Sequence, residues 1–161
     1  MEENTRPGSS ITDKLLETLG IAGIITLIVL PAVFYNQLPQ EIPTHFGIKG
    51  TPDDFGDKAT IWLLPVIGVV LYAGLAFLNY FLVRREITSK IGLNVGKYQK
   101  QGAFNLLQFV KAILAISFAY IEFATIQTAL SRAEGLGVWF LPSFIIVLTF
   151  VPIAFLTRTL K

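Results

Sequence analysis

The chain has 161 residues, of which 53% are hydrophobic and 15% are charged, and its formal net charge is +2. A soluble domain carries about 25% charged residues, so the composition argues against a soluble globular protein, and the small net charge argues against nucleic-acid binding. The chain has no cysteine, which excludes disulfides and thiolate metal sites.

Four apolar segments are long enough to cross a bilayer, which takes about 20 mostly apolar residues. The second and fourth lack the polar stripe that a helix of a soluble bundle would carry. We therefore predict an all-α membrane protein, with residues 1–161 forming a single integral membrane domain built as a four-transmembrane-helix bundle. The predicted spans are residues 15–35, 61–83, 104–127 and 138–156.

The first apolar segment is predicted to be an uncleaved membrane anchor. It is too long for the h-region of a signal peptide, and no small-x-small cleavage site follows it. Thr12 or Asp13 is expected to cap the start of its helix. Pro31 lies near the other end and is expected to bend or stop the helix.

Residues 36–60 are polar and rich in proline and glycine, and they are predicted to form an ordered extracytoplasmic loop between the first two helices. A long loop without evident regular structure is commonly functional. A turn with proline at its second position is expected over Thr51–Asp54. We predict a compact cap across the outer ends of the helices, anchored by four apolar residues, Ile42, Phe46, Ile48 and Phe55.

The loop carries a pattern with fixed spacing, LP-x-x-IP-x-HF-x-x-x-G-x-PD-x-x-G-x-K. Its members are Leu38, Pro39, Ile42, Pro43, His45, Phe46, Gly50, Pro52, Asp53, Gly56 and Lys58. The pattern resembles the N-terminal domain of the SdpI-type immunity proteins, which also occurs alone in short bacterial membrane proteins of undetermined function. The resemblance covers residues 15–83, and a looser continuation follows. It implies an immunity or sensor protein of the bacterial envelope.

The candidate binding residues are His45, Asp53, Lys58 and Glu122. His45 is the only histidine, and its side chain can bind a metal or move a proton near neutral pH. Together with carboxylates it could form a divalent-cation site, for which the weak candidates are His45, Asp53, Asp54 and Asp57. The alternative is that His45 and Asp53 bond to the loop backbone and hold the cap together, while Lys58 pairs with an aspartate or reaches the membrane surface.

Basic residues are distributed unevenly over the predicted loops. Both termini and the loop 84–102 hold nine, Arg6, Lys14, Arg84, Arg85, Lys90, Lys97, Lys100, Arg158 and Lys161, whereas the opposite side holds three, Lys49, Lys58 and Arg132. The positive-inside rule therefore predicts a multi-pass protein of the inner (plasma) membrane with cytoplasmic N- and C-termini. Tyr35, Trp62 and Trp139 fall at the ends assigned to the outer interface. The basic loop is expected to contact anionic lipid headgroups or a cytoplasmic partner.

Two charged residues interrupt the third span. Lys111 and Glu122 are separated by almost a whole number of helical turns, so they share one face of the helix at a distance of about 16 Å. Lys111 is expected to extend to the inner headgroups. Glu122 is expected beneath the outer loop, where it would meet His45 or Lys58 or face a cavity under the cap. The alternative is a neutral Glu122 that is hydrogen-bonded to a neighbouring helix.

These observations predict a non-enzymatic envelope protein that recognises a hydrophobic peptide, a toxin or a lipid at its outer cap. The alternative is an accessory subunit of a larger membrane complex, such as a transporter or a respiratory assembly. Neither H-E-x-x-H nor G-x-S-x-G occurs, so we expect no enzyme, and no cofactor is predicted. The expected partners are membrane lipids, a peptide or toxin ligand, and a membrane protein or second copy of the chain, but no nucleic acid.

Overall fold

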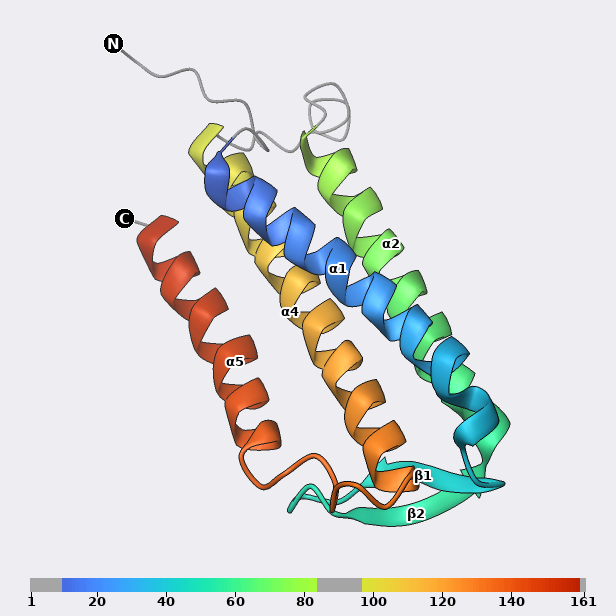
Figure 1. Cartoon of the computed structure of the whole chain (residues 1–161). Helices are drawn as coiled ribbons and strands as arrows, with labels where there is room; N and C mark the ends of the chain where they lie inside the picture. Colours follow the sequence, from blue (N-terminus) through green and yellow to red (C-terminus); the bar gives the residue numbers. More distant parts are fainter. Residues whose placement is uncertain (1–9, 84–96, 160–161) are drawn as a thin grey trace.

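The computed structural model describes residues 10–83 and 97–159, so most of the predicted basic loop 84–102 lies outside the described residues. The described part is mostly helical and contains one small sheet (Figure 1). Its elements are α1 (Ile11–Phe34), η1 (Tyr35–Gln37), β1 (Glu41–Phe46), β2 (Pro52–Asp57), η2 (Lys58–Trp62), α2 (Leu63–Val83), α4 (Lys97–Ala129) and α5 (Phe140–Thr159), where η denotes a 3-10 helix.

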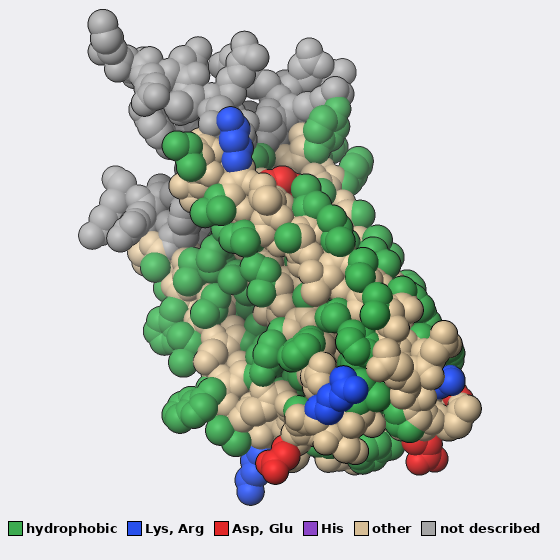
Figure 2. All heavy atoms as spheres, viewed as in Figure 1, with side chains coloured by type: hydrophobic (Ala, Val, Ile, Leu, Met, Phe, Trp, Pro, Cys, Tyr) green, Lys and Arg blue, Asp and Glu red, His purple; other side chains and the backbone are tan. Residues whose placement is uncertain are grey.

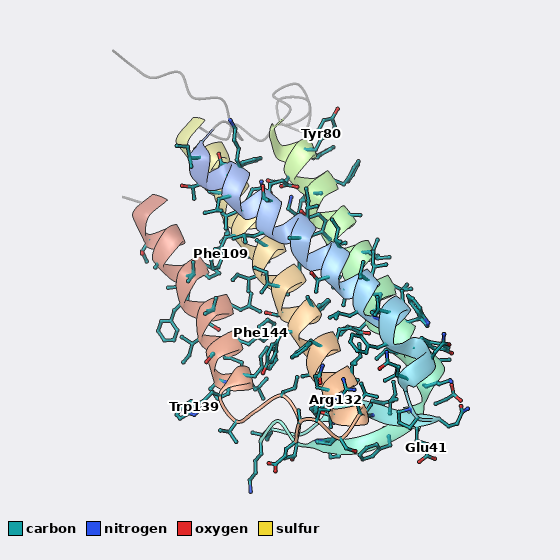
Figure 3. The ribbon with its side chains drawn as sticks, in the orientation of Figure 1. Glu41, Tyr80, Phe109, Arg132, Trp139 and Phe144 are labelled. Carbon is teal, nitrogen blue, oxygen red and sulfur yellow. The ribbon has the colours of Figure 1, made fainter. Side chains whose placement is uncertain are left out.

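Helix α4 is the central helix of the fold. It packs against α1, α2 and α5, and α1 also contacts α2. The strands β1 and β2 close one end of the helices, while the start of α1 and the end of α2 lie at the opposite end (Figure 1). Tyr35 and Trp62 pack together beside the sheet, with ring centroids 6.3 Å apart, and Trp139 also lies toward this end (Figure 3). The structure therefore confirms that the three aromatic residues share one end.

Three helices are long and apolar enough to cross a membrane, and they cover Ile11–Gln37, Lys58–Phe81 and Gly102–Ala129. These ranges contain nearly all of the first three predicted spans. In α5 the apolar part found among the described residues is Phe140–Ala154, which is shorter than the roughly 20 residues that a crossing takes. Figure 2 shows apolar side chains along the middle of the visible face and charged side chains toward its two ends.

Helix α1 begins with a capping box whose cap, Ser10, lies two or three residues before the expected one. The hydroxyl of Ser10 accepts a hydrogen bond from the backbone N–H of Asp13 at 3.0 Å, and the Asp13 carboxylate accepts one from the N–H of Ser10 at 3.3 Å. This exchange satisfies two N–H groups at the helix start, so the prediction of Thr12 or Asp13 as the cap was wrong. Pro31 is buried inside α1, which continues to Phe34.

The segment predicted as an irregular loop forms an antiparallel hairpin of β1 and β2, so the all-α prediction was incomplete. The chain reverses between Gly47 and Thr51, where the N–H of Gly47 donates to the Thr51 carbonyl at 2.9 Å. Pro52 starts β2, and the predicted turn over Thr51–Asp54 was therefore wrong. A left-handed backbone at Gly50, with φ of 76°, allows the reversal because glycine has no Cβ.

A small apolar core joins the hairpin to the ends of the helices. It consists of Leu38, Ile42, Ile61 and Ile126. Of the four expected anchors, Ile42 is buried and Phe46 is half-buried, whereas Ile48 and Phe55 are 85% and 56% exposed. The difference has a simple cause: β1 lies against α4, while β2 pairs with the outer edge of β1 and its residues are exposed or half-buried.

Replacing Gly50 by alanine is expected to lower the thermal stability more than replacing Gly137 by alanine. Both glycines are left-handed, with φ of 76° and 79°, which costs other residues roughly 1–2 kcal/mol. A Cβ at Gly50 would also lie 2.5 Å from the carbonyl oxygen of Gly137, whereas one at Gly137 would meet no atom within 4 Å. Thermal unfolding of the two variants in detergent measures the difference, and equal losses would contradict the contact between the hairpin tip and the loop before α5.

Candidate functional site

A cavity of about 430 Å³ lies beneath the hairpin, and we refer to it as the subhairpin cavity. Strand β1 and the hairpin tip cover it, η2 and α2 form one side, and α4 and α5 form the others. Its volume is within the range of small-molecule sites, about 300–1,000 Å³. Most of its lining is apolar, including Ile42, Leu64, Ile67, Ile121, Leu141 and Phe144.

Glu122 contributes a carboxyl group to this apolar lining. The residue is 1% exposed, and its Oε1 atom has no hydrogen-bond partner among the described residues. Buried polar groups nearly always have a partner, because leaving one unpaired costs free energy. The prediction that Glu122 faces a cavity under the cap thus agrees with the geometry, whereas its Oε1 makes no bond to a neighbouring helix in the described structure.

Stacked aromatic rings hold α5 against α4 and build one wall of the cavity. Tyr120 stacks on Phe140 with centroids 5.0 Å apart, and Phe140 stacks on Phe144 at 5.8 Å. The side chain of Phe144 is directed from α5 toward α4 (Figure 3). The Tyr120 hydroxyl donates to the carbonyl of Leu136 at 2.9 Å, so the same cluster also fixes the loop that leads into α5.

His45 and Asp53 face each other across the hairpin. The Nδ1 atom of His45 lies 2.5 Å from Oδ1 of Asp53, and their side chains are 68% and 52% exposed. They bond to each other, whereas bonds to the loop backbone were the expected alternative. An exposed pair of this kind contributes little stability. His45 also belongs to the lining of the subhairpin cavity, so His45 and Glu122 share one site without an observed hydrogen bond between them in the described structure.

The remaining candidates on the hairpin have separate local contacts. The ammonium of Lys58 lies 5.1 Å from the centroid of the Tyr35 ring, a cation–π contact in place of the expected aspartate pair. Asp54 accepts a hydrogen bond from Thr44 at 3.2 Å, and Asp57 accepts one from the N–H of Ala59 at 2.7 Å and caps η2. Within the described ranges, no three histidine or acidic side chains converge as they would around a metal ion.

Lys111 does not extend to the membrane surface, so that expectation was wrong. The residue is 3% exposed, and its Nζ lies 2.6 Å from Oε2 of Glu17 and 4.8 Å from the centroid of the Tyr72 ring. Gln108 donates to the same Glu17 oxygen at 2.8 Å. We refer to the connected residues as the polar network, which consists of Glu17, Tyr72, Asn79, Gln108 and Lys111.

Sequence reasoning missed Glu17, although a signal for it was present. Glu17 and Lys111 are charges of opposite sign, and each lies within a mostly apolar span. Charged residues within membrane spans usually pair with one another. The two residues are 94 positions apart, and a comparison of the charged positions between spans would have suggested the pair.

Close apolar packing separates the polar network from the subhairpin cavity. A Cβ at Gly23 of α1 would lie 2.9 Å from the backbone carbon of Ala115 in α4. Further along, Leu27 is fully buried, and a Cβ at Gly68 would meet its side chain at 2.5 Å. The middle of the helices is therefore filled by side chains, and the two polar regions are distinct sites.

Comparison with known proteins identifies one domain. Residues 22–69 match the family described as Domain of unknown function (DUF1648). The finding supports a DUF1648-containing membrane protein family. The match extends from α1 through the hairpin into α2, so the matched segment supplies the cover and one side of the subhairpin cavity, whereas Glu122 lies outside it. The match does not single out the SdpI-type immunity proteins.

One protein is similar to this chain over most of the length of both. An uncharacterized protein of Archaeoglobus fulgidus is 28% identical over 149 residues, which cover 84% of this chain and 81% of that protein. This similarity extends well beyond the DUF1648 domain. No solved structure matches the chain.

Proposed function

We propose that this protein is a non-enzymatic membrane protein that binds a hydrophobic ligand in the subhairpin cavity and acts as an immunity or sensor protein. One observation carries the proposal: an apolar cavity of about 430 Å³ lies under an ordered hairpin and contains a buried carboxyl group with an unpartnered oxygen. Ligand sites commonly combine apolar walls with a few polar groups that orient the ligand. The candidate ligands are a lipid, a hydrophobic peptide and a toxin.

The proposal includes a topology for the chain in the plasma membrane. In it, α5 is a fourth crossing, the N- and C-termini are cytoplasmic, and the hairpin lies outside. Nine basic residues on the side of the termini against three on the hairpin side support this orientation. Residues 1–161 then form one integral membrane domain, with His45, Asp53 and Lys58 on the outer hairpin and Glu122 below it.

Filling the cavity is expected to weaken retention of the ligand. Ile67 lines the cavity, whereas its neighbour Val66 does not and is 59% exposed. We expect Ile67→Trp to lower the fraction of protein carrying a bound apolar molecule by at least tenfold, roughly 1.4 kcal/mol in binding free energy. Native mass spectrometry of protein purified in mild detergent measures this fraction, and Val66→Trp is the matched control. Equal occupancy in the two variants would count against the proposal.

A second candidate function is that of an accessory subunit of a larger membrane complex. The exposed apolar residues of the hairpin favour it, because Ile48 at the turn and Phe55 on β2 are 85% and 56% exposed. Apolar side chains exposed on the hairpin can form part of a protein contact. In the same purification, a stable set of partner proteins on the wild type but not on an Ile48→Ser/Phe55→Ser variant would support this function over ligand binding.

A further inference from the structure

We infer that the ligand of the subhairpin cavity is an amphiphile from the bilayer that carries a primary ammonium group on a single apolar chain, and that Glu122 binds this ammonium. The inference rests on the proposed function and specifies the chemistry of its ligand. It concerns the one acidic side chain among the residues that line the cavity.

The first argument is charge complementarity. A carboxylate in apolar surroundings is strongly destabilised unless a cation or several donors accompany it. No lysine or arginine belongs to the described lining of the cavity. Lys111, which lies on the same helix, is paired with Glu17, and Lys58 contacts the ring of Tyr35. The cation that complements Glu122 is therefore expected to come from the ligand, and an ammonium–carboxylate hydrogen bond is among the stronger ones.

The second argument distinguishes an ammonium from a metal ion. Calcium takes about 6–8 oxygen ligands, and magnesium requires an octahedral set. The cavity lining offers one carboxyl group, threonine hydroxyls, apolar side chains and the imidazole of His45. The Nδ1 atom of that imidazole is already bonded to Asp53, and no metal-type cluster occurs among the described residues. An ammonium needs fewer partners, because it has three N–H donors. Glu122 and the neighbouring Thr125, which is also buried, suit a single small donor group.

The third argument concerns the route of entry. The cavity lies between α2 and α5, which both pack on α4. Ile67 of α2 lines the cavity and is also 41% exposed. The cavity wall formed by α2 therefore continues onto the outer surface of this helix, which is apolar and long enough to span the membrane. An apolar chain can therefore leave the cavity sideways among lipid tails. The volume suits a small headgroup and the first part of a chain better than a folded peptide.

The test compares three probes that share one alkyl chain: dodecylamine, dodecanol and dodecanoate. Each is titrated into the full-length protein in lipid nanodiscs, and binding is followed by native mass spectrometry. We expect wild-type protein to bind dodecylamine at least tenfold more tightly than dodecanol, and dodecanoate more weakly than either. Glu122→Gln is expected to lose the preference for the amine while keeping its affinity for the alcohol. Glu134→Gln changes an exposed carboxyl outside the cavity and should leave the preference unchanged.

The outcomes separate the inference from the proposed function. Equal binding of amine and alcohol to the wild type, both lost in Ile67→Trp, would overturn the ammonium inference and leave cavity binding intact. Binding of no probe above the level of Ile67→Trp would overturn both. If a hydrophobic peptide bound more tightly and displaced dodecylamine, the inference of a lipid-like ligand would be overturned, and a peptide would be the better candidate. The wild-type preference decides the question even if Glu122→Gln does not fold.

Discussion

Replacing Glu17 by leucine is expected to destabilise the protein by up to about 3 kcal/mol, because it leaves the buried ammonium of Lys111 without its counter-ion. This is the lower end of the range for fully buried pairs, since the side chain of Glu17 is itself 38% exposed. Lys111 is 3% exposed, and Glu17 accepts hydrogen bonds from Lys111, Gln108 and Tyr72 at 2.6, 2.8 and 3.1 Å. The loss therefore affects contacts to both α4 and α2. Unfolding of the purified protein by denaturant in bicelles measures the free energy.

The double variant Glu17→Leu/Lys111→Met is the informative control. It removes both charges and replaces them with apolar groups, a change that is commonly neutral or stabilising in buried pairs. We expect it to recover most of the stability that Glu17→Leu loses, with a coupling energy of about 0.5–3 kcal/mol in the cycle. If the double variant were as unstable as the sum of the two single variants, the ion pair would not be the reason for the loss.

Replacing Gly23 by leucine is expected to disrupt the contact between α1 and α4. A Cβ at this position would already lie 2.9 Å from the backbone of Ala115, and backbone atoms cannot move aside as a side chain can. Overpacking a close contact typically costs about 1–3 kcal/mol and occasionally more, and helices in membranes depend on small residues for close approach. The same denaturant titration reports the loss.

Gly74 provides the matched control for this substitution. It lies on the apolar helix α2, and a Cβ there would meet no atom within 4 Å. Gly74→Leu is expected to be neutral or slightly stabilising, since leucine favours a helix over glycine by about 1 kcal/mol. Comparable losses at Gly23 and Gly74 would show that the close approach of α1 to Ala115 does not matter for stability.

These two predictions concern the half of the fold that does not line the subhairpin cavity. Three regions follow one another along α4. Gln108 and Lys111 belong to the polar network, and Ala115 lies at the close contact with α1. Glu122 then faces the subhairpin cavity. The network and the close contact are expected to stabilise the helices on which the hairpin packs. Variants at Ile67 or Glu122 can therefore be interpreted as changes in binding once their unfolding free energies match that of the wild type.

Several features of the candidate site agree with expectations from single residues. The pattern around His45 and Asp53 predicted an ordered cap, with bonds from both residues to the loop backbone as one alternative. The segment forms a hairpin, and the two residues bond to each other instead, at 2.5 Å. The depth of Glu122 in its span predicted a position below that structure, and Glu122 lines the cavity under β1. Both expectations needed only residue spacing and helix geometry. The ligand, the topology and the binding roles remain predictions.

The hairpin itself was missed for a local reason. Prolines and glycines interrupt β1 and β2 and hide the alternation of apolar and polar residues that signals a strand. The register pairs Ile42 with Gly56 and Pro43 with Phe55, so an apolar residue on one strand lies opposite a residue that usually breaks strands. Only the packing of β1 on α4 shows which apolar residues become anchors, and it buries Ile42 while leaving Phe55 exposed.

The sequence alone predicts where the long helices lie, because the length and composition of an apolar run reflect the thickness of a bilayer and the rise of a helix. It did not determine which charges are paired. Lys111 and Glu122 are similar as sequence features, each a charge within one span, yet Lys111 pairs with Glu17 94 residues away and Glu122 has an oxygen without a partner. Such partners are set by how helices distant in sequence pack together, and that arrangement exists only in the tertiary structure.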